Sequence, residues 1–466
     1  MNVKPYPKYK SSGVDWLGDV PEKWRIKRLK CLISTNDNAL PETTDPDYEM
    51  LYVDISSVDP ARGIIKKEPF LFENAPSRAR RIVKDGDTIV STVRTYLRAI
   101  AAIDNPEEKL IVSTGFAVLR PRKILPRYLS YVMRSPYVVE TIVSKSVGVS
   151  YPAINASEIG FIKISVPDSD EQNLISDFLD RETGRIDELI AKKERLIELL
   201  KEKRTALISR AVTKGLNPNV RLKPSGVKWL GDVPEHWEVK RLKTSANYWV
   251  SNVDKVPAEH EQPVRLCNYT DVYYNDFISS DMDMMETTAT SEEIKKFHLE
   301  IEDVVITKDS EEWDDIAISS LVIKTSPDMV CGYHLAMIRP LKRNLLGQYL
   351  ARQFQSSAIN HQFQIAATGV TRYGLPKSAI GEAIIPIPPI AEQQAIAEYL
   401  DKETGKIDSL IDKVTQAIEI LKEYRTAIIS AAVTGKIDVK GYKYGPEKIK
   451  KYFRPPSYRT GGNRSI

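Results

Sequence analysis

The clearest helical pattern in the chain is a run in which apolar residues recur every three or four positions. This run contains Ile407, Leu410, Val414, Ala417, Leu421, Tyr424 and Ile428. Such spacing places apolar side chains along one side of a helix and is typical of a coiled-coil seam. An earlier segment carries the same frame, interrupted by Lys193 and Lys203, at Ile186, Leu189, Leu196, Leu200 and Leu207. We therefore predict two long helices that pack against each other through these seams.

Short apolar runs typical of β-strands precede each predicted helix. The first region contains "MLYVDI", "DTIVSTV", "FAVLRP" and "FIKISVP", and the second contains "VRLCNY", "DVVITK", "HLAMIRP" and "AIIPIPP". A helical segment follows the third strand in both regions, near Leu125–Lys145 and near Leu345–Gln364. The common order predicts two α+β domains of one fold.

Two phrases of the sequence occur twice. "SGVDWLGDVPEKW" begins at Ser12 and "SGVKWLGDVPEHW" at Ser225, and 15 of the 19 positions from Ser12 to Lys30 are identical in the second copy. The helical segment that begins "FLDRETGRIDELI" at Phe178 returns as "YLDKETGKIDSLI" at Tyr399. A repeat of more than 200 residues is too long for a solenoid unit of about 20–50 residues. The repeated unit is a whole domain followed by its helix.

These landmarks divide the chain into five parts: residues 1–170, 171–216, 217–390, 391–436 and 437–466. Proline and acidic residues mark both helix starts, and Gly215 and Gly435 mark both ends. Gly184 and Gly405 lie inside the helices, where they indicate either a kink or a close approach of the two backbones. The tail 437–466 has 8 basic and 2 acidic residues, and we expect it to be poorly ordered.

Composition is that of a globular protein, with 42% hydrophobic and 28% charged residues. No apolar run resembles a signal peptide or a membrane span, so we expect a cytoplasmic protein. Cys31, Cys267 and Cys331 form no metal-binding or disulfide pattern, and we interpret all three as buried thiols.

The common catalytic motifs are absent from the sequence. It contains no GxxxxGK[ST], GxSxG, HExxH or GxGxxG pattern. The five histidines all lie in the second half, so a histidine site would exist in only one repeat. The acidic run from Asp309 to Asp315 is interpreted as a solvated loop. We therefore predict no catalytic residue, no metal ligand and no bound cofactor.

The overall charge does not by itself predict a nucleic-acid partner. Residues 217–390 carry 18 basic and 23 acidic residues. Any nucleic-acid surface must therefore be local. Basic and aromatic residues lie beside small residues in "STVRTYLRA" and "KSVGVSYP", with second-half equivalents in "TKDSEEWDD" and "ATGVTRYGLPK".

The ordered series of motifs resembles one known family. A variable domain that opens with "SGVxWLGDVPExW" and closes with "IPIPPIAEQQAI", followed by "YLDKETGKIDSLI" and "YRTAIISAAVTGK", closely resembles half of a type I restriction-modification specificity subunit. The resemblance extends from about Lys4 to Val439. It implies tandem α/β target recognition domains, each followed by a conserved helix, with the two helices packed as an antiparallel coiled coil in a pseudo-twofold molecule.

The resemblance also implies partners and cofactors. The chain would read a bipartite site on double-stranded DNA and have no activity of its own. Two methyltransferase subunits would supply S-adenosylmethionine for N6-adenine methylation. Restriction subunits, where present, would supply ATP and Mg. Four residues of the repeated phrase are interpreted as core or subunit-docking anchors and not as base-stacking residues: Trp16, Trp24, Trp229 and Trp237.

The family resemblance does not identify the DNA-contacting residues, so we assign them from local composition. In the first domain they are Arg94, Tyr96, Arg98, Lys145, Ser150 and Tyr151. In the second they are Lys308, Trp313, Thr371, Arg372, Tyr373 and Lys377.

Two other hypotheses stay open. The chain could be a coiled-coil scaffold that joins proteins without DNA, or a nuclease or methyltransferase that acts alone. A neighbouring reading frame with an Asn-Pro-Pro-Tyr or Asn-Pro-Pro-Phe motif would argue against the scaffold. Methyl transfer by the purified chain without a partner would establish the last hypothesis.

Overall fold

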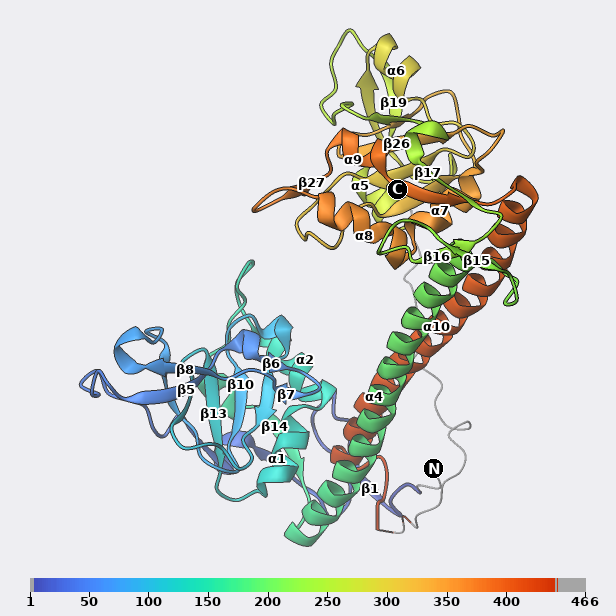
Figure 1. The fold of residues 1–466 in the computed structure, drawn as a ribbon. Coiled ribbons are helices and arrows are strands. Elements are labelled where there is room, and N and C mark those ends of the chain that lie inside the picture. Colours follow the sequence, from blue (N-terminus) through green and yellow to red (C-terminus); the bar gives the residue numbers. More distant parts are fainter. Residues whose placement is uncertain (1–3, 441, 443–466) are drawn as a thin grey trace, which may run out of the picture. The chain divides into compact units, whose positions relative to one another are not determined.

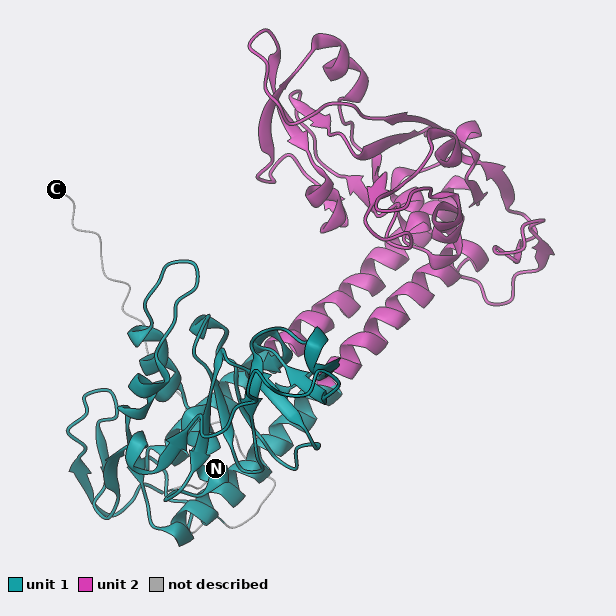
Figure 2. Ribbon diagram, turned by 90° about the vertical axis from the view of Figure 1, so that its left-hand side faces the viewer, with its two compact units in different colours: residues 1–192, 417–466 teal, residues 193–416 magenta. Residues whose placement is uncertain are grey.

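The computed structural model describes residues 4–440 and 442, which belong to two compact units (Figure 2). Of the described residues, unit 1 comprises 4–192, 417–440 and 442, and unit 2 comprises 193–416. The division falls inside the two long helices, α4 (Ser169–Lys214) and α10 (Ile390–Val433). Each unit therefore contains one α+β domain and part of each long helix.

Unit 1 is built on two four-stranded sheets (Figure 1). One has the order β11-β10-β13-β4, and the other has the order β8-β5-β12-β9. The first sheet consists of β4 (Ile33–Thr35), β10 (Thr88–Ser91), β11 (Ile100–Ala102) and β13 (Phe116–Pro121). The second consists of β5 (Glu49–Val53), β8 (Glu68–Leu71), β9 (Ala79–Ile82) and β12 (Leu110–Ser113). Small pairs are β1 (Tyr9–Ser11) with β2 (Asp19–Pro21), β3 (Arg25–Arg28) with β14 (Lys163–Val166), and β6 (Val58–Asp59) with β7 (Gly63–Ile64).

Unit 2 is also built on two sheets, but they have five and three strands instead of four each. Its larger sheet has the order β18-β26-β22-β24-β20, and its smaller sheet has the order β21-β19-β25. The larger sheet consists of β18 (Ala246–Val250), β20 (Phe277–Ile278), β22 (Val304–Thr307), β24 (Ser319–Val322) and β26 (Leu335–Pro340). The smaller consists of β19 (Gln262–Cys267), β21 (Met285–Ala289) and β25 (Met329–Cys331). Small pairs are β15 (Leu222–Pro224) with β16 (Asp232–Pro234), β17 (Glu238–Arg241) with β28 (Ile384–Ile387), and β23 (Asp309–Ser310) with β27 (Tyr373–Gly374).

The helix expected in each α+β domain is divided into two. In unit 1 these are α1 (Pro126–Met133) and α2 (Pro136–Lys145), and in unit 2 they are α7 (Gly347–Phe354) and α8 (Ser357–Ala366). Pro136 accounts for the first interruption, because it begins a new helix and lacks the N–H that would continue the old one. The remaining short helices are α3 (Ala156–Gly160), α5 (Tyr269–Tyr273), α6 (Ser291–Phe297) and α9 (Lys377–Glu382).

The long helices run antiparallel within each unit. In unit 1 the Arg425 Nε donates to Asp187 Oδ1 at 2.8 Å, and in unit 2 the Arg204 Nε donates to Asp408 Oδ1 at 3.1 Å. Asp187 and Arg204 of α4 correspond in the repeat to Asp408 and Arg425 of α10. The same pair is thus formed twice with its partners exchanged between helices, which confirms the pseudo-twofold packing.

The observed seam differs from the predicted one at Leu196 and Leu410. Ile186, Leu200, Ile407, Val414 and Ile428 are buried as expected, and Leu189, Leu207 and Leu421 are half-buried. Leu196 and Leu410 were wrongly placed in the seam, because their side chains are 40% and 43% exposed. Ile197, Ile411 and Ile418 are covered instead, so the intervening position lies one residue later than predicted.

The structure confirms the prediction for the two glycines at the helix ends but not the close approach considered for the two glycines inside the helices. Gly215 and Gly435 have φ of +73° and +70°, the left-handed conformation expected just after a helix end. A Cβ built at Gly184 or Gly405 would meet no atom within 4 Å. A close backbone approach at Gly184 and Gly405 is therefore wrong.

Residues after α10 also differ from expectation. Ile437 and Tyr442 pack against the core of unit 1, and Val439 is buried within it. The start of the expected tail is thus part of the fold, whereas residue 441 and residues 443–466 lie outside the described residues. Cys267 and Cys331 are buried, but Cys31 is exposed and is not the buried thiol expected.

Candidate nucleic-acid interface

In unit 1 two predicted segments come together at one end of the β10 strand. Loop 1 (residues 92–99) follows β10, and hairpin 1 (residues 147–153) follows α2. The hairpin is closed by two backbone hydrogen bonds between Val147 and Ala153, at 2.9 and 3.0 Å. Ile154 N, just beyond it, donates to Thr92 O at 2.9 Å, so the hairpin is joined to the loop.

Side chains of loop 1 and hairpin 1 contact each other. The Arg94 guanidinium lies over the Tyr151 ring at 4.9 Å from its centroid. Arg94 and Arg98 both have left-handed backbones, with φ of +51° and +53°, which turn the loop sharply. Arg98 pairs with Glu140 of α2 at 2.7 Å, and its side chain remains 55% exposed. Tyr96, Ser150 and Lys145 are also exposed, so predicted residues from both segments form one surface.

Unit 2 has the same arrangement of a loop and a hairpin, but its loop is acidic whereas loop 1 is basic. Loop 2 (residues 308–317) follows β22, and hairpin 2 (residues 368–374) follows α8. Thr368 and Gly374 close the hairpin at 2.9 and 3.1 Å, and β23 in the loop pairs with β27 in the hairpin. Leu375 N donates to Lys308 O at 2.8 Å. Thr371, Arg372 and the 50% exposed Trp313 lie on the accessible side of this pair.

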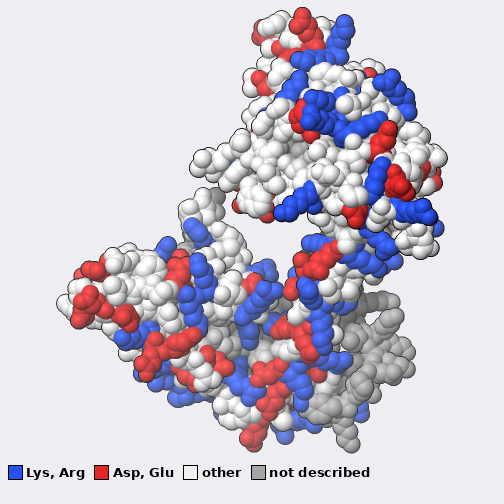
Figure 3. All heavy atoms as spheres, viewed as in Figure 1, with Lys and Arg blue, Asp and Glu red and all other residues white. Residues whose placement is uncertain are grey.

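The acidic run is only partly the solvated loop expected. Asp309 is half-buried and pairs with Lys308 at 3.1 Å and with His334 Nδ1 at 2.5 Å. Asp315 accepts a hydrogen bond from the Tyr273 hydroxyl, which raises the pKa of Tyr273 to about 12. Glu311, Glu312 and Asp314 remain exposed beside Trp313. Figure 3 shows basic and acidic side chains interspersed over the visible face of each unit, without a field of one sign.

The other two predicted residues of the second domain are placed differently. Tyr373 is half-buried in β27, so its backbone is paired with loop 2. Lys377 begins α9, and its Nζ lies 5.7 Å from the centroid of the Tyr248 ring. Lys377 therefore flanks the loop and hairpin from a separate element.

The repeated tryptophan phrase anchors each α+β domain to the end of a long helix. Trp24 and Trp237 are 1% and 0% exposed. A Cβ on Gly435 would lie 3.2 Å from the Trp24 ring, and a Cβ on Gly215 would lie 3.2 Å from the Trp237 ring. Each indole thus packs where a C-terminal glycine leaves room. Of the two roles expected for these residues, Trp24 and Trp237 have that of core anchors, and a partner cannot dock on their side chains because they are buried.

The other two tryptophans of the phrase are more accessible. Trp16 is 45% exposed and stacks on Tyr137 with 4.8 Å between ring centroids. Trp229 is half-buried against the core of unit 2. Docking through Trp16 and Trp229 stays a prediction.

A second anchor uses two buried tyrosines that sequence reasoning missed. The Tyr128 hydroxyl donates to Ser165 O and Val433 O, at 3.1 and 3.3 Å. The Tyr349 hydroxyl makes the equivalent bonds to Pro386 O and Val212 O, at 3.3 and 3.2 Å. Each domain is thus attached to the end of the helix that belongs to the other repeat. The sequence does contain a signal for this anchor, because Tyr128 and Tyr349 occupy matching positions in the two predicted helical segments.

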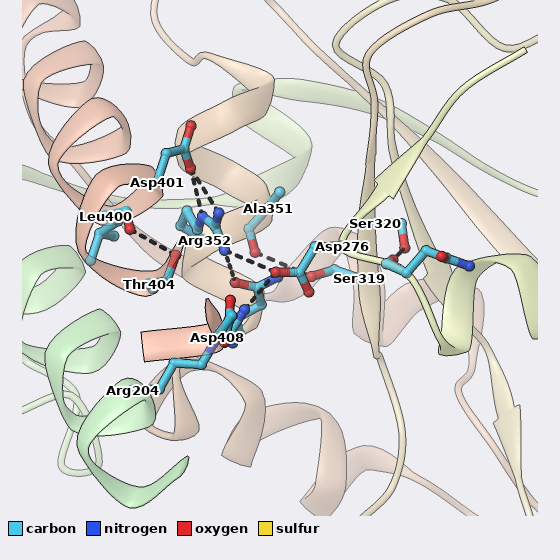
Figure 4. Close-up of polar contacts among 12 residues, drawn as sticks. Arg204, Asp276, Ser319, Ser320, Ala351, Arg352, Leu400, Asp401, Thr404 and Asp408 are labelled. Atoms are coloured by element: carbon cyan, nitrogen blue, oxygen red, sulfur yellow. Dashed lines mark hydrogen bonds and ion pairs between the residues drawn. The ribbon is translucent and has the colours of Figure 1, made fainter. Parts of the chain in front are cut away.

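A network of charged residues also joins domain and helices in unit 2 (Figure 4). Arg352 of α7, only 5% exposed, donates to Asp401 of α10 at 2.7 Å and to Asp276 at 3.3 Å. Arg204 of α4 pairs with the same Asp276 at 2.5 Å. Asp276 therefore bridges two arginines from different elements, and the unlike charges offset the cost of burying Arg352.

At the equivalent position of unit 1 a tyrosine replaces the arginine. The Tyr131 hydroxyl donates to Asp180 of α4 at 2.5 Å. Burial and this carboxylate together raise the pKa of Tyr131 to about 12. Both domains are held through the same helix aspartate, Asp180 or Asp401, by different donors.

The described residues contain no group of three or more His, Cys, Asp or Glu side chains placed to hold a metal ion. Across the same residues, no helix is both long and apolar enough to cross a membrane.

Comparisons with known proteins give one family. The model of the type I restriction modification DNA specificity domain matches residues 21–199 and 234–419, one match in each repeat. A Methanocaldococcus jannaschii chain proposed to be the specificity subunit of the type I restriction enzyme MjaX is 24% identical over 447 residues, which cover 91% of this chain and 96% of that one. The Escherichia coli K12 EcoKI specificity subunit is 22% identical over 337 residues, covering 71% of this chain and 70% of the relative.

A solved structure supports the fold. It comes from work described as the structural basis of complex assembly and conformational transition of the type I R-M system, and its chain superposes with a TM-score of 0.69 at 20% identity. The match covers 89% of this chain and 98% of the other. With both repeats matched by the family model, the chain belongs to the family of type I restriction-modification DNA specificity subunits.

Proposed function

We propose that each recognition domain reads one half of a bipartite, asymmetric DNA sequence, and that the chain itself catalyses no reaction. The observation that supports this proposal is the loop and hairpin that recur in both units, on domains that Tyr128 attaches to the end of α10 and Tyr349 to the end of α4. Two reading surfaces of one design but different sequence suit two unlike half-sites. The helices then hold the domains apart and set the length of the unread spacer.

The chain's partners follow from its family. Two methyltransferase subunits dock on the pseudo-symmetric frame and supply S-adenosylmethionine for N6-adenine methylation. Restriction subunits, where present, supply ATP-driven cleavage with Mg. The exposed Trp16 and the half-buried Trp229, at equivalent places in the repeat, are the docking side chains that we retain.

Domain exchange tests this proposal. Residues from Lys243, just after β17, to Pro386 in β28 are replaced by the same region of another family member. The hybrid is coexpressed with the cognate methyltransferase, and N6-methyladenine is mapped across the genome. We expect one half of the methylated sequence to change while the other half stays constant.

The reciprocal exchange of the first domain is the control and should change only the other half. Altered sequence in both halves after either exchange would contradict independent reading. Methylation by the unmodified chain without any methyltransferase subunit would contradict the absence of catalysis.

A further inference from the structure

The two hairpins share a short motif, in which a glycine is followed by a valine and then by a residue with a hydroxyl group. Hairpin 1 has Gly148-Val149-Ser150 at its tip, and hairpin 2 has Gly369-Val370-Thr371 at the equivalent place. The neighbouring segments have diverged so far that loop 1 is basic and loop 2 is acidic. Because the valine is present on both tips despite this divergence, we look for a role that it has in both domains.

Both valines are held away from the fold. Val149 is 102% exposed and Val370 is 90% exposed. An isolated exposed valine is ordinary on a protein surface. Hairpin 1, however, also carries the exposed side chains of Val147 and Tyr151, and exposed apolar side chains that gather in this way mark interaction sites.

Glycine geometry forces this presentation. Gly148 and Gly369 have φ of +123° and +152°, a backbone that other residues rarely adopt. A Cβ at Gly369 would lie 1.9 Å from Arg372 O, and one at Gly148 would lie 3.2 Å from Tyr151 O. Glycine lets each hairpin close tightly, and the exposed valine is the next residue. Figure 1 shows that the hairpin containing β27 projects from its unit.

We propose that Val149 and Val370 enter the major groove of the two DNA half-sites and contact thymine methyl groups. The proposal rests on the DNA-reading function above. The major groove is about 12 Å wide and admits a two-stranded β-ribbon. A valine offers no hydrogen-bonding group to a base, and the apolar group that bases display in that groove is the C5-methyl of thymine.

One arginine near each tip fits the same approach. Arg94 lies over Tyr151 beside Val149, and Arg372 follows Thr371 beside Val370. These guanidinium groups are suited to the phosphates or guanines that border the groove. The tip then supplies the apolar contact that neither arginine can make.

The test begins with the full chain and its methyltransferase. Selection from a library of randomised duplexes defines the bipartite sequence bound by the unchanged complex. If no bipartite sequence emerges, the proposed function fails before the hairpins are tested. If one emerges, all thymines of one half are replaced by uracil, which lacks the C5-methyl group.

For the unchanged complex we expect uracil in either half to lower affinity by about three- to tenfold. Val149→Ala should lower affinity for the thymine duplex by a similar factor and should abolish the response to uracil in one half only. Val370→Ala should do the same for the opposite half. Both side chains are on the surface, so truncation has little effect on folding.

Val256→Ala is the matched control, because Val256 is 72% exposed but lies outside both hairpins. It should behave as the unchanged complex. The inference is overturned if the two hairpin variants bind the thymine duplex with unchanged affinity. It is equally overturned if each variant keeps its full response to uracil in both halves.

Discussion

Tyr131 and Arg352 show how one position can perform the same task with different chemistry. Both lie on the helix that covers the recognition domain, and both donate to the equivalent helix aspartate. The arginine needs more partners, since a buried guanidinium is costly unless it is paired. Asp276, which comes from a loop that precedes β20, is the additional partner, and no spacing in the sequence links it to Arg352 or Arg204.

Replacing Arg352 should therefore destabilise unit 2. Arg352→Met leaves Asp401 without its arginine and Asp276 with Arg204 alone. We expect a loss of about 1–3 kcal/mol in the free energy of unfolding, below the value for a wholly buried pair because both aspartates are partly exposed. Urea unfolding measures it. Lys192→Met, which breaks an exposed pair, should stay within about 0.5 kcal/mol, and equal effects of both variants would contradict a special role for Arg352.

Asp328 provides a test of pH dependence. Hydrogen bonds from Arg265, the larger effect, and from Ser326 lower its pKa to about 2. A carboxyl whose pKa is lower in the folded chain stabilises it above pH 4, and the contribution disappears as the pH falls toward 2. Asp328→Asn should lower stability at pH 7 by less than about 1 kcal/mol, because the side chain is half exposed. Unfolding curves between pH 7 and pH 3 should converge with those of the unchanged chain, and a gap that widens would be the opposite result.

The arginines beside the hairpins belong to the same scale. Arg94→Ala or Arg372→Ala should lower affinity for cognate DNA at least tenfold, because a bidentate contact with guanine contributes about 1–3 kcal/mol of discrimination. Binding at two salt concentrations distinguishes a phosphate contact, which changes the salt slope, from a base contact. Unchanged affinity in both variants would remove these two residues from the interface.

The long helices show which part of an element is predictable from its sequence. Ile186, Leu200, Ile407, Val414 and Ile428 are recognised because one seam position in each heptad is apolar almost throughout. The second seam position was predicted one residue too early at Leu196 and Leu410, where Ile197 and Ile411 are covered instead. Leu196 and Leu410 are strongly apolar yet exposed, while Arg204 and Arg425 occupy the seam as charged partners of Asp408 and Asp187. Hydrophobicity alone cannot identify a seam position held by an ion pair.

The helices should also act as a ruler. Leu200 and Leu421 are equivalent seam positions, so inserting one heptad after each keeps the apolar face and adds about 10.5 Å per helix. At about 3.4 Å per base pair this is at most roughly three base pairs. We expect methylation of the same half-sequences with a longer spacer, read by mapping N6-methyladenine. Methylation at the original spacing would reduce the helices to a tether.

At the scale of the whole molecule, neither repeat is an independent structural unit. The first domain is attached to the end of α10 at Val433, and the second to the end of α4 at Val212. The duplication and the fold class were visible in the sequence, because repeated phrases and strand order survive divergence. The exchange of helix ends was not visible, since periodicity does not specify which helix terminus contacts which domain.

The contact between Lys4 and Asp438 has a topological consequence. Asp438 N donates to Lys4 O at 2.8 Å, so the segment after α10 meets the segment before β1. At the equivalent place in unit 2, residues 216–221 run without interruption from α4 to β15. If the segments at Lys4 and Asp438 were joined, the chain would be a closed circle. The natural break in that circle lies at one of two equivalent sites, and the other is the connection from α4 to β15. A permuted chain that keeps Val439 and Tyr442 in the core of unit 1, with residues 442 and 4 joined through a short linker and new ends between Asn217 and Asn219, should fold and keep the same DNA target. Far-UV circular dichroism and methylation mapping would test this, and failure to fold would mean that the two sites are not interchangeable.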